Sequence, residues 1–277
     1  MGNLDGLGYA GKTVVVTGGS SGMGAAAVRI LGDLGAKVHV VDIQPPSVPH
    51  EAFYQTDLSK PEDVRLTAAA LAAIAPIHFL FPCAGIPPHG QGALQCMAVN
   101  YIGTRYFVEQ VVPHLEDGAG IALISSDAAM SWQKNLAQNL ELLAIADPVE
   151  ARAWCEANPD KLRDGYTTSK EMLVVWVQQA AIRLGVERRI RLNCTGPCPT
   201  ATAFMEQSIP VLGQAFIDNF PYPVLGRMAT AEEQAWPLIL LNCQLNAAVT
   251  GAFLYTDQGF AGGLATGALD AKAIMGG

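Results

Sequence analysis

The sequence predicts an α/β protein built as a single-domain, doubly wound parallel sheet. Three observations predict this class. Apolar, β-branched runs alternate with helix-length segments, a glycine-rich turn joins the first run to the first helix, and no repeat, low-complexity tract or linker divides the 277 residues. We therefore expect one domain over residues 1–277, an ordinary length for this kind of sheet.

The first run, TVVVTG at 13–18, is continuous and β-branched, as expected for a strand that is buried on both faces. The helix that follows it ends at Gly35. A helix at 61–75 is expected to have Ser59 as its N-cap and Pro61 in its first turn, and a long helix is expected at 166–184. Strands separated by helices imply parallel βαβ units, whose ligand lies at the carboxyl ends of the strands. The other strands are expected at 37–42, 77–85, 120–126, 190–197 and 251–259.

Composition and charge restrict the partners. Half of the residues are apolar and 15% are charged, which suits a well-buried core. The net charge of −8 and the lack of a basic patch argue against nucleic acid or an anionic membrane surface. The longest apolar run, 66–85, is interrupted by Pro76 and His78, so we interpret it as a helix and a strand rather than a membrane span. The first twelve residues contain no apolar core of signal-peptide length, and a soluble protein is expected.

Six cysteines, at positions 83, 96, 155, 194, 198 and 243, form no C-x-x-C motif. Cys194 and Cys198 are a candidate metal pair, but histidine is scarce beside them, and buried free thiols are the better interpretation. Free thiols are typical of a reducing compartment, so a cytoplasmic location is expected.

The turn after the first strand reads TGGSSGMG at 17–24, with the spacing G-x-x-x-G-x-G. Glycines there permit positive φ and let backbone N–H groups approach a pyrophosphate at the positive end of a helix. An ordinary tight turn is the alternative, but the position between a strand and a helix favours a dinucleotide site. The residues expected at this site are Gly18, Ser20, Ser21, Gly22, Met23 and Gly24.

Asp42 ends the second strand, eighteen residues after Gly24. A carboxylate at this place accepts hydrogen bonds from an adenosine ribose and repels a 2′-phosphate. The next residues, Ile43 and Gln44, are not basic, so we expect NAD rather than NADP, with Asp42 and Ile43 at the adenosine. The alternative is a strand-end carboxylate that only caps a turn.

Tyr166 and Lys170, in the stretch GYTTSK, lie four positions apart and share a face if the segment is helical. Free tyrosine has a pKa near ~10, and lowering it to neutrality requires about 4 kcal/mol. A unit positive charge at about 4 Å supplies roughly that much at an effective dielectric constant of ~20. The pair is therefore a candidate acid–base catalyst, although the spacing alone is common by chance.

In this order, TGGSSGMG, Asp42, CAG (83–85), VNYIG (99–103), ISS (124–126) and YTTSK (166–170) resemble the short-chain dehydrogenase/reductase family over nearly the whole chain. The resemblance implies a Rossmann fold, a nicotinamide cofactor and metal-free interconversion of an alcohol and a carbonyl compound. It implies that Tyr166 is the general acid/base and that Lys170 lowers the pKa of Tyr166 and binds the nicotinamide ribose. Ser126, with Ser125 as the alternative, is implied to hydrogen-bond the reacting oxygen.

The resemblance implies further contacts. Asn100 matches an asparagine that supports a water-linked proton path, and a helix-start cap is the alternative. The remaining cofactor contacts implied are Asp57 and Leu58 at the adenine, Ala84 and Gly85 against the cofactor, and Pro197, Thr200 and Thr202 towards the carboxamide, where Thr200 and Thr202 compete for one role.

Two motifs depart from the family pattern. Its N-N-A-G is replaced by Pro82-Cys83-Ala84-Gly85, which loses asparagines that steady the central strands. Its P-G after the fifth strand becomes Pro197-Cys198, and cysteine adopts positive φ less freely than glycine. We therefore expect the loop beside the nicotinamide to differ from that of relatives.

The largest departure is an insertion at about 130–164, which separates Ser126 from Tyr166 by forty positions. It is helical in composition, with an apolar stripe of Leu136, Leu140 and Leu143 and a second helix start at Asp147. It resembles the insertions of bacterial 3α-hydroxysteroid dehydrogenase/carbonyl reductases and coniferyl-alcohol dehydrogenases. A substrate lid and a change in subunit packing are both open interpretations.

The segment at about 203–227 is interpreted as an apolar substrate cover, with ordinary core as the alternative; its large residues are Phe204, Met205, Phe216, Phe220 and Tyr222. The resemblance implies an NAD-dependent oxidoreductase for a small hydrophobic alcohol or ketone, cyclic or aromatic, of hydroxysteroid or coniferyl-alcohol type. A homodimer or homotetramer is expected, paired through the helices near Asn100 and Tyr166. An NAD(H)-binding regulatory or scaffold protein without turnover is the alternative, and a lyase or dehalogenase is disfavoured because the glycine-rich loop is whole.

Overall fold

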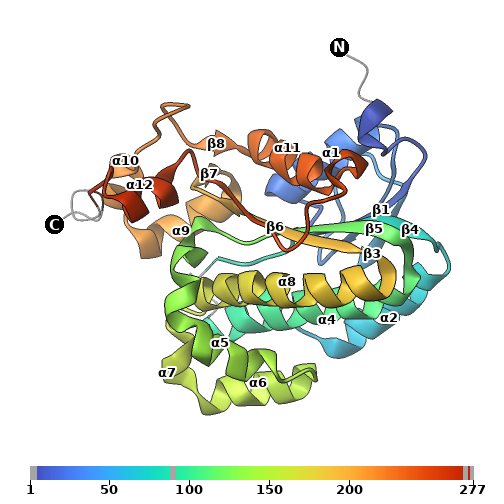
Figure 1. Cartoon of the computed structure of the whole chain (residues 1–277), viewed down its shortest axis with the longest axis horizontal. Coiled ribbons are helices and arrows are strands. Elements are labelled where there is room, and N and C mark those ends of the chain that lie inside the picture. Colours follow the sequence, from blue (N-terminus) through green and yellow to red (C-terminus); the bar gives the residue numbers. More distant parts are fainter. Residues whose placement is uncertain (1–4, 88–91, 271–273, 275–277) are drawn as a thin grey trace.

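A seven-stranded parallel sheet organises the chain in the computed structural model, which describes residues 5–87, 92–270 and 274 (Figure 1). Every pairing in the sheet is parallel, and the predicted α/β class is confirmed. In sheet order the strands are β3 (Ala52–Gln55), β2 (Lys37–Asp42), β1 (Thr13–Thr17), β4 (Ile77–Pro82), β5 (Leu115–Ile124), β6 (Arg191–Pro197) and β9 (Phe253–Thr256).

Helices cover both faces of the sheet. Side chains alternate along each strand, so Val15 joins the core on one face while Val14 and Val16 join the core on the other. The first face is covered by α2 (Pro61–Ala72), η2 (Met97–Gly103), α4 (Thr104–Val111) and α8 (Tyr166–Arg188), and the second by α1 (Gly22–Asp33) and α11 (Ala231–Asn242) (Figure 1). Burial on both faces explains the continuous apolar runs of the central strands.

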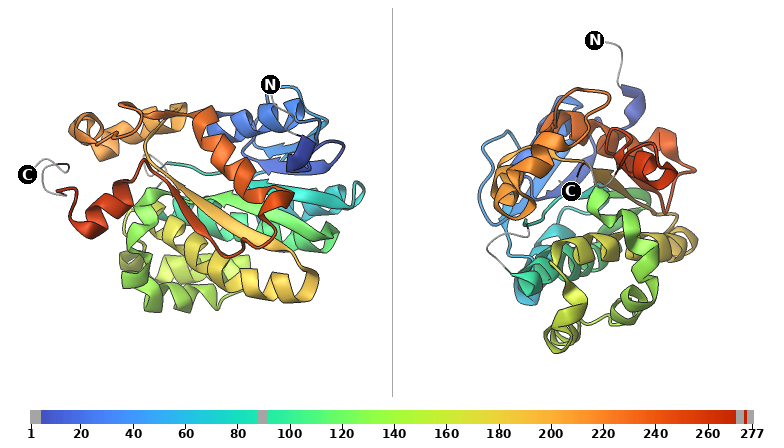
Figure 2. Two further views of the ribbon diagram at one scale, coloured as in Figure 1. Left: turned by 45° about the horizontal axis from the view of Figure 1, so that its top comes forward. Right: turned by 90° about the vertical axis from the view of Figure 1, so that its left-hand side faces the viewer.

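The insertion is helical, as predicted. Asp147 accepts hydrogen bonds from the Val149 and Glu150 backbone N–H groups and is the N-cap of the helix Pro148–Ala157 (α6). The predicted apolar stripe is partly wrong, because Leu140 is 41% exposed while Leu142 and Leu143 are buried. Figure 2 shows the insertion on the same side of the sheet as α8. Its elements are η4 (Asp127–Asn135), α5 (Leu136–Leu143), α6 (Pro148–Ala157) and α7 (Pro159–Leu162).

Two local predictions need correction. The edge strand β3 is short and half-buried, and it was not expected from the sequence. The N-cap of α2 is Lys60 rather than Ser59, because the Ser59 amide and hydroxyl both donate to Asp57 Oδ1 instead. The remaining elements are η1 (Asp5–Leu7), α3 (Ala93–Cys96), η3 (Val112–His114), β7 (Thr200–Ala201), α9 (Ala203–Leu212), α10 (Gln214–Asn219), β8 (Ala229–Thr230), η5 (Gln244–Asn246) and α12 (Phe260–Thr266).

Within the described part of the chain, no helix is both long enough and apolar enough to span a bilayer. No cluster of histidine, cysteine or carboxylate side chains there is suited to a metal ion, and all six cysteines are free thiols. Cys194 and Cys198 are both buried, in line with the thiol interpretation.

Candidate active site

A cavity of about 730 Å³ opens at the carboxyl edge of the sheet, where parallel strands bring their ends together. It receives the residues that follow β1, β2, β4, β5 and β6, together with the start of α8 and parts of α9, α10 and α12. It gathers nearly all of the predicted site residues: Gly18, Ser21, Gly22, Met23, Gly24, Asp42, Ile43, Asp57, Leu58, Ala84, Gly85, Ser126, Tyr166, Lys170, Pro197, Thr200 and Thr202. Ser20 and Asn100 are not in its wall.

The glycine-rich turn requires glycine for reasons of space. Gly18 has φ +68°, and an added Cβ there would lie 2.5 Å from the Cα of Ala84. A Cβ on Gly24 would lie 2.0 Å from the carbonyl oxygen of Gly18. α1 begins at Gly22, within this stretch, and its N-cap Ser21 makes no side-chain hydrogen bond to the first turn of the helix. The N–H groups at the start of α1 therefore remain open to an anion in the cavity, which fits the phosphates of a dinucleotide.

Asp42 lies at the end of β2 and faces the cavity. Its Oδ2 accepts from the Ser20 backbone N–H at 3.0 Å and its Oδ1 from the Gln44 N–H at 3.3 Å. Ser20 thus acts on the site through Asp42, and its own hydroxyl donates to the Gln44 carbonyl oxygen. Lys170 is the one cationic side chain among the described wall residues. An acid without a basic neighbour at this end of the cavity suits an unphosphorylated ribose.

Other groups replace the asparagines missing from the P-C-A-G segment. The hydroxyl of Thr17 accepts from the Ala84 N–H at 3.2 Å. Asn242 of α11 donates to the carbonyl oxygens of both Leu80 and Gly120 and so bridges β4 and β5. Cys198 is buried, and its backbone does not adopt positive φ, so this departure imposes no backbone strain.

Tyr166 and Lys170 stand one turn apart at the start of α8, as predicted. Lys170 Nζ lies 5.6 Å from the centre of the Tyr166 ring and donates to the Ile124 carbonyl oxygen at 2.9 Å. Burial lowers the pKa of Lys170 to about 8. Burial also raises the pKa of Tyr166, although the Ser126 side chain opposes that rise. The residues of this chain by themselves therefore do not lower the pKa of Tyr166, in contrast to the prediction from the sequence.

Ser126 is better placed than Ser125 to meet a substrate. Ser125 is only 1% exposed, and its hydroxyl donates to the Lys170 carbonyl oxygen at 2.9 Å. Ser126 Oγ accepts from the Ala128 N–H and donates to Asp127 Oδ1, which keeps it at the cavity wall. The serine assigned to the substrate oxygen thus adjoins an acid that the sequence reasoning left without a role.

Asn100 lies in η2 and is fully buried. Its Oδ1 accepts from the Ile86 N–H at 2.8 Å, and its Nδ2 donates to the Ile86 carbonyl oxygen and to Ser169 Oγ. Asn100 therefore joins the loop after β4 to α8 behind the cavity. These contacts describe a positioning residue, and the proton path stays a prediction.

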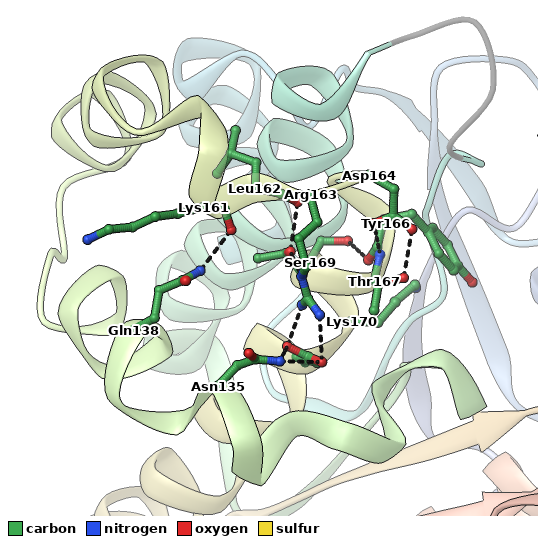
Figure 3. Close-up of polar contacts among 12 residues, drawn as sticks. Asn135, Gln138, Lys161, Leu162, Arg163, Asp164, Tyr166, Thr167, Ser169 and Lys170 are labelled. Atoms are coloured by element: carbon green, nitrogen blue, oxygen red, sulfur yellow. Dashed lines mark hydrogen bonds and ion pairs between the residues drawn. The ribbon is translucent and has the colours of Figure 1, made fainter.

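The helices of the insertion brace α8 instead of covering the cavity, and of its described residues only Met130 and Asp164, at its ends, reach the cavity wall. Described residues of α5, α6 and α7 contribute nothing to the cavity wall. Glu171, fully buried on α8, pairs with Arg163 at 2.5 Å and accepts from Asn135 Nδ2 at 3.0 and 3.1 Å. Figure 3 shows Asn135 and the Arg163 guanidinium on one side of the helix start and the Tyr166 ring pointing away from them. Asp164 adds a cap, since its carboxylate accepts from the Thr167 amide and hydroxyl.

The substrate end of the cavity is largely apolar. Phe204, Met205 and Phe216 of the predicted cover line it, whereas Phe220 and Tyr222 pack into a small core with Cys198. Sequence reasoning missed several wall residues. The position of Asp127 directly after Ser126 could have indicated that Asp127 lies in the cavity wall. The apolar residues after the last strand belong to no motif that could have indicated this. The missed residues include Cys83, Ile86, Asp127, Met130, Phe260, Leu264 and Ile274.

Comparisons with known proteins agree with this architecture. The chain matches a family model described as short chain dehydrogenase over residues 12–137, and one described as enoyl-(acyl carrier protein) reductase over 157–261. It is 33% identical to coniferyl-alcohol dehydrogenase from Pseudomonas sp., over 90% of this chain and 96% of that protein. It is 29% identical to 3-alpha-hydroxysteroid dehydrogenase/carbonyl reductase from Comamonas testosteroni, over 89% and 95%.

Solved structures share the fold. A 3-alpha-hydroxysteroid dehydrogenase from Pseudomonas sp., complexed with NADH, superposes with a TM-score of 0.76 at 20% identity, over 94% of this chain and all of that one. An aldohexose dehydrogenase from Thermoplasma acidophilum has a TM-score of 0.71 at 20% identity, over 92% and 95%. With the fold, the dinucleotide-type turn and the Ser–Tyr–Lys arrangement in agreement, the chain belongs to the short-chain dehydrogenase/reductase family of oxidoreductases.

Proposed function

We propose that the protein is an NAD-dependent alcohol dehydrogenase/ketone reductase acting on a hydrophobic cyclic or aromatic alcohol. The observation that carries the proposal is one cavity that joins the Asp42 end of β2 to Ser126, Tyr166 and an apolar wall. The names of the relatives support this substrate class, since they describe enzymes of coniferyl alcohol and of hydroxysteroids.

Each residue has a chemical task in this proposal. Ser126, whose hydroxyl donates to Asp127 Oδ1 in the structure, would turn that hydrogen to the substrate oxygen, and Tyr166 takes the carbinol proton during oxidation and returns it during reduction. Bound NAD would accept the hydride from the carbinol carbon, and its positive ring favours the tyrosinate form of Tyr166. Lys170, held by the Ile124 carbonyl oxygen in the cavity wall, adds positive potential and is the residue that would bind the nicotinamide ribose.

The test is NADH formation with a panel containing coniferyl alcohol, a 3α-hydroxysteroid, a monocyclic terpenol and cyclohexanol. We expect turnover of at least one member with NAD, and a fall of about 10²-fold or more in Tyr166→Phe, because general acid–base catalysis typically contributes 10²–10⁴. NADH binding, measured by calorimetry, should survive this substitution, since the lost hydroxyl acts on the substrate. Unchanged turnover in Tyr166→Phe would remove Tyr166 from the chemistry.

The same assay separates the alternatives. A kcat/KM with NADP equal to that with NAD would contradict the proposed role of Asp42. Tight NADH binding without turnover of any alcohol would favour a cofactor-binding protein that performs no redox reaction.

A further inference from the structure

Asp127 occupies an unusual place beside the reacting centre. It follows Ser126 directly, starts η4 and faces the cavity. Its Oδ1 accepts from Ser126 Oγ at 3.1 Å, the same hydroxyl that the proposed function assigns to the substrate oxygen. Because a serine hydroxyl has one hydrogen, a substrate oxygen that takes this hydrogen bond leaves Asp127 Oδ1 free to accept from another donor beside the reacting centre.

The surroundings leave this carboxylate without a counter-charge. Asp127 forms no ion pair among the residues that the structure describes, and Lys170, the one cation in the described wall, is committed to the Ile124 carbonyl oxygen. Its hydrogen bonds are local: the Ser126 hydroxyl and backbone N–H groups of the first turn of η4. A carboxylate has about four acceptor positions and three hydrogen bonds use them, so about one is left for a ligand in the cavity.

The cavity wall is largely apolar and therefore destabilises the ionised form of Asp127. Met130, Phe204, Phe216 and Phe260 form the apolar part of the same cavity. Burial, which solvates the charge poorly, is the largest cause that raises the pKa of Asp127 to about 7, and the nearby Asp257 adds to it. Closing an apolar substrate over an unpaired carboxylate would increase this cost, whereas a substrate that carries a donor would offset it.

We propose that Asp127 is a specificity-determining residue that binds a second hydrogen-bond donor of the substrate, a hydroxyl or an ammonium group, one or two carbons from the reacting carbinol carbon. This inference rests on the proposed function and refines it, since the substrate class becomes diols and amino alcohols with an apolar body. The position follows from geometry, because a group at the far end of a long substrate does not reach a residue adjacent to Ser126. A carboxylate at the same substrate position is disfavoured by like charge wherever Asp127 is ionised, above about pH 7.

The test compares four ligands of one ring size. They are cis-1,2-cyclohexanediol, 2-aminocyclohexanol, 2-methoxycyclohexanol, which has the oxygen but no donor, and 2-hydroxycyclohexanecarboxylate. We expect the diol and the amino alcohol to exceed the methoxy ether in kcat/KM by about 10-fold or more, and the carboxylate to be the poorest. Ligand affinities measured by calorimetry on the enzyme mixed with NADH should follow the same order. No alcohol is oxidised in this experiment, because the cofactor is already reduced.

Two substitutions of Asp127 distinguish the donors. Asp127→Asn removes the charge but keeps an acceptor oxygen, so the preference for the ammonium should vanish while part of the preference for the hydroxyl remains. In Asp127→Ala, the kcat/KM values of the diol, the amino alcohol and the methoxy ether should lie within about 3-fold of each other, because both acceptor oxygens are gone. Glu206→Gln is the control, because Glu206 is an exposed acid of α9 outside the cavity wall; the ratios of kcat/KM between ligands in this variant should equal those of the wild type.

The outcomes are separable from those of the proposed function. Turnover that is lost in Tyr166→Phe but equal for diol and ether would uphold the dehydrogenase and overturn the role of Asp127. Ratios that survive in Asp127→Ala, or failure of the diol and the amino alcohol to bind better than the ether, would overturn it too. Preferential binding of the donors, lost in Asp127→Ala but without turnover of any ligand, would uphold the recognition and contradict the dehydrogenase.

Discussion

At the residue scale, the site depends on how burial shifts ionisation. Burial raises the pKa of Tyr166 and lowers that of Lys170 to about 8, so each residue is pushed towards its neutral form. A lysine at 5.6 Å from the ring centre does not offset the desolvation of the phenol in the chain alone. In the proposed reaction, the tyrosinate form of Tyr166 would therefore depend on the positive charge of the oxidised nicotinamide ring.

Asp127 gives a pH-dependent prediction about stability. Its pKa rises from 3.8 to about 7 on folding, so the folded chain binds more protons than the unfolded chain between these values. The free energy of unfolding should thus fall as pH rises from about 4 to 7, and Asp127→Asn should be free of this loss. Relative to wild type, we expect the variant to gain about 1–3 kcal/mol between pH 5 and pH 8, less than the full shift because the carboxyl is partly solvated.

Thermal unfolding of both proteins at pH 5 and pH 8 measures this difference. A constant gap in Tm between Asp127→Asn and wild type at the two pH values would contradict the raised pKa. The measurement needs no cofactor or substrate, so it is independent of the proposed reaction.

At the element scale, the start of α8 is held from three directions. Gly165 has φ +72°, and an added Cβ would lie 2.3 Å from the Ala93 carbonyl oxygen, so the chain passes tightly against α3 just before Tyr166. Asp164 caps the first turn, and Arg163 and Asn135 bind Glu171 one turn further along. The position of Tyr166 is thus set by residues at both ends of the insertion.

The ion pair between Arg163 and Glu171 predicts a large coupling free energy between these two residues. Arg163→Met should lower the free energy of unfolding by up to about 3–5 kcal/mol. The substitution leaves the fully buried Glu171 carboxylate with Asn135 as its main remaining partner. Adding Glu171→Leu should recover most of that loss, since no unpaired charge then remains. A double-mutant cycle by denaturant unfolding measures the coupling, and additive effects would show that the pair does not act as a unit.

At the scale of the whole molecule, the insertion changes which surfaces are open. η4 and α5 pack against α8, while α6 lies against η2, so the first part of α8 is covered (Figures 1 and 2). Further along α8, Ile182 and Val186 are 68% and 83% exposed, and their i, i+4 spacing puts them on one face. We propose that the chain forms a homodimer or homotetramer and that this uncovered part of α8 takes part in pairing.

Light scattering coupled to gel filtration tests the assembly. We expect two or four times the chain mass for wild type and a smaller species for Ile182→Lys/Val186→Lys, because two charges replace the apolar contact. Arg152→Ala, an exposed change in α6, is the control and should leave the mass unaltered. A monomeric wild type would contradict the proposal, and an unchanged double variant would place the interface elsewhere.

The sequence determined what depends on short spacing. TGGSSGMG needs only a strand before it and a helix after it, and Tyr166 and Lys170 need only one helical turn, so both were predictable from local pattern. The parallel sheet followed from the alternation of apolar runs. The short strand β3 was missed because four half-buried residues carry almost no hydrophobic signal.

The tertiary structure alone decided the features set by distant contacts. Asn135 and Glu171 meet across 36 positions, and Asn242 reaches carbonyl groups more than a hundred residues away. Asp127 became notable only when residues from α9, α10 and α12 closed an apolar wall around it. No periodicity records such partners, because they depend on how the whole chain packs, and the charge of a carboxylate acquires its cost only in that packed surrounding.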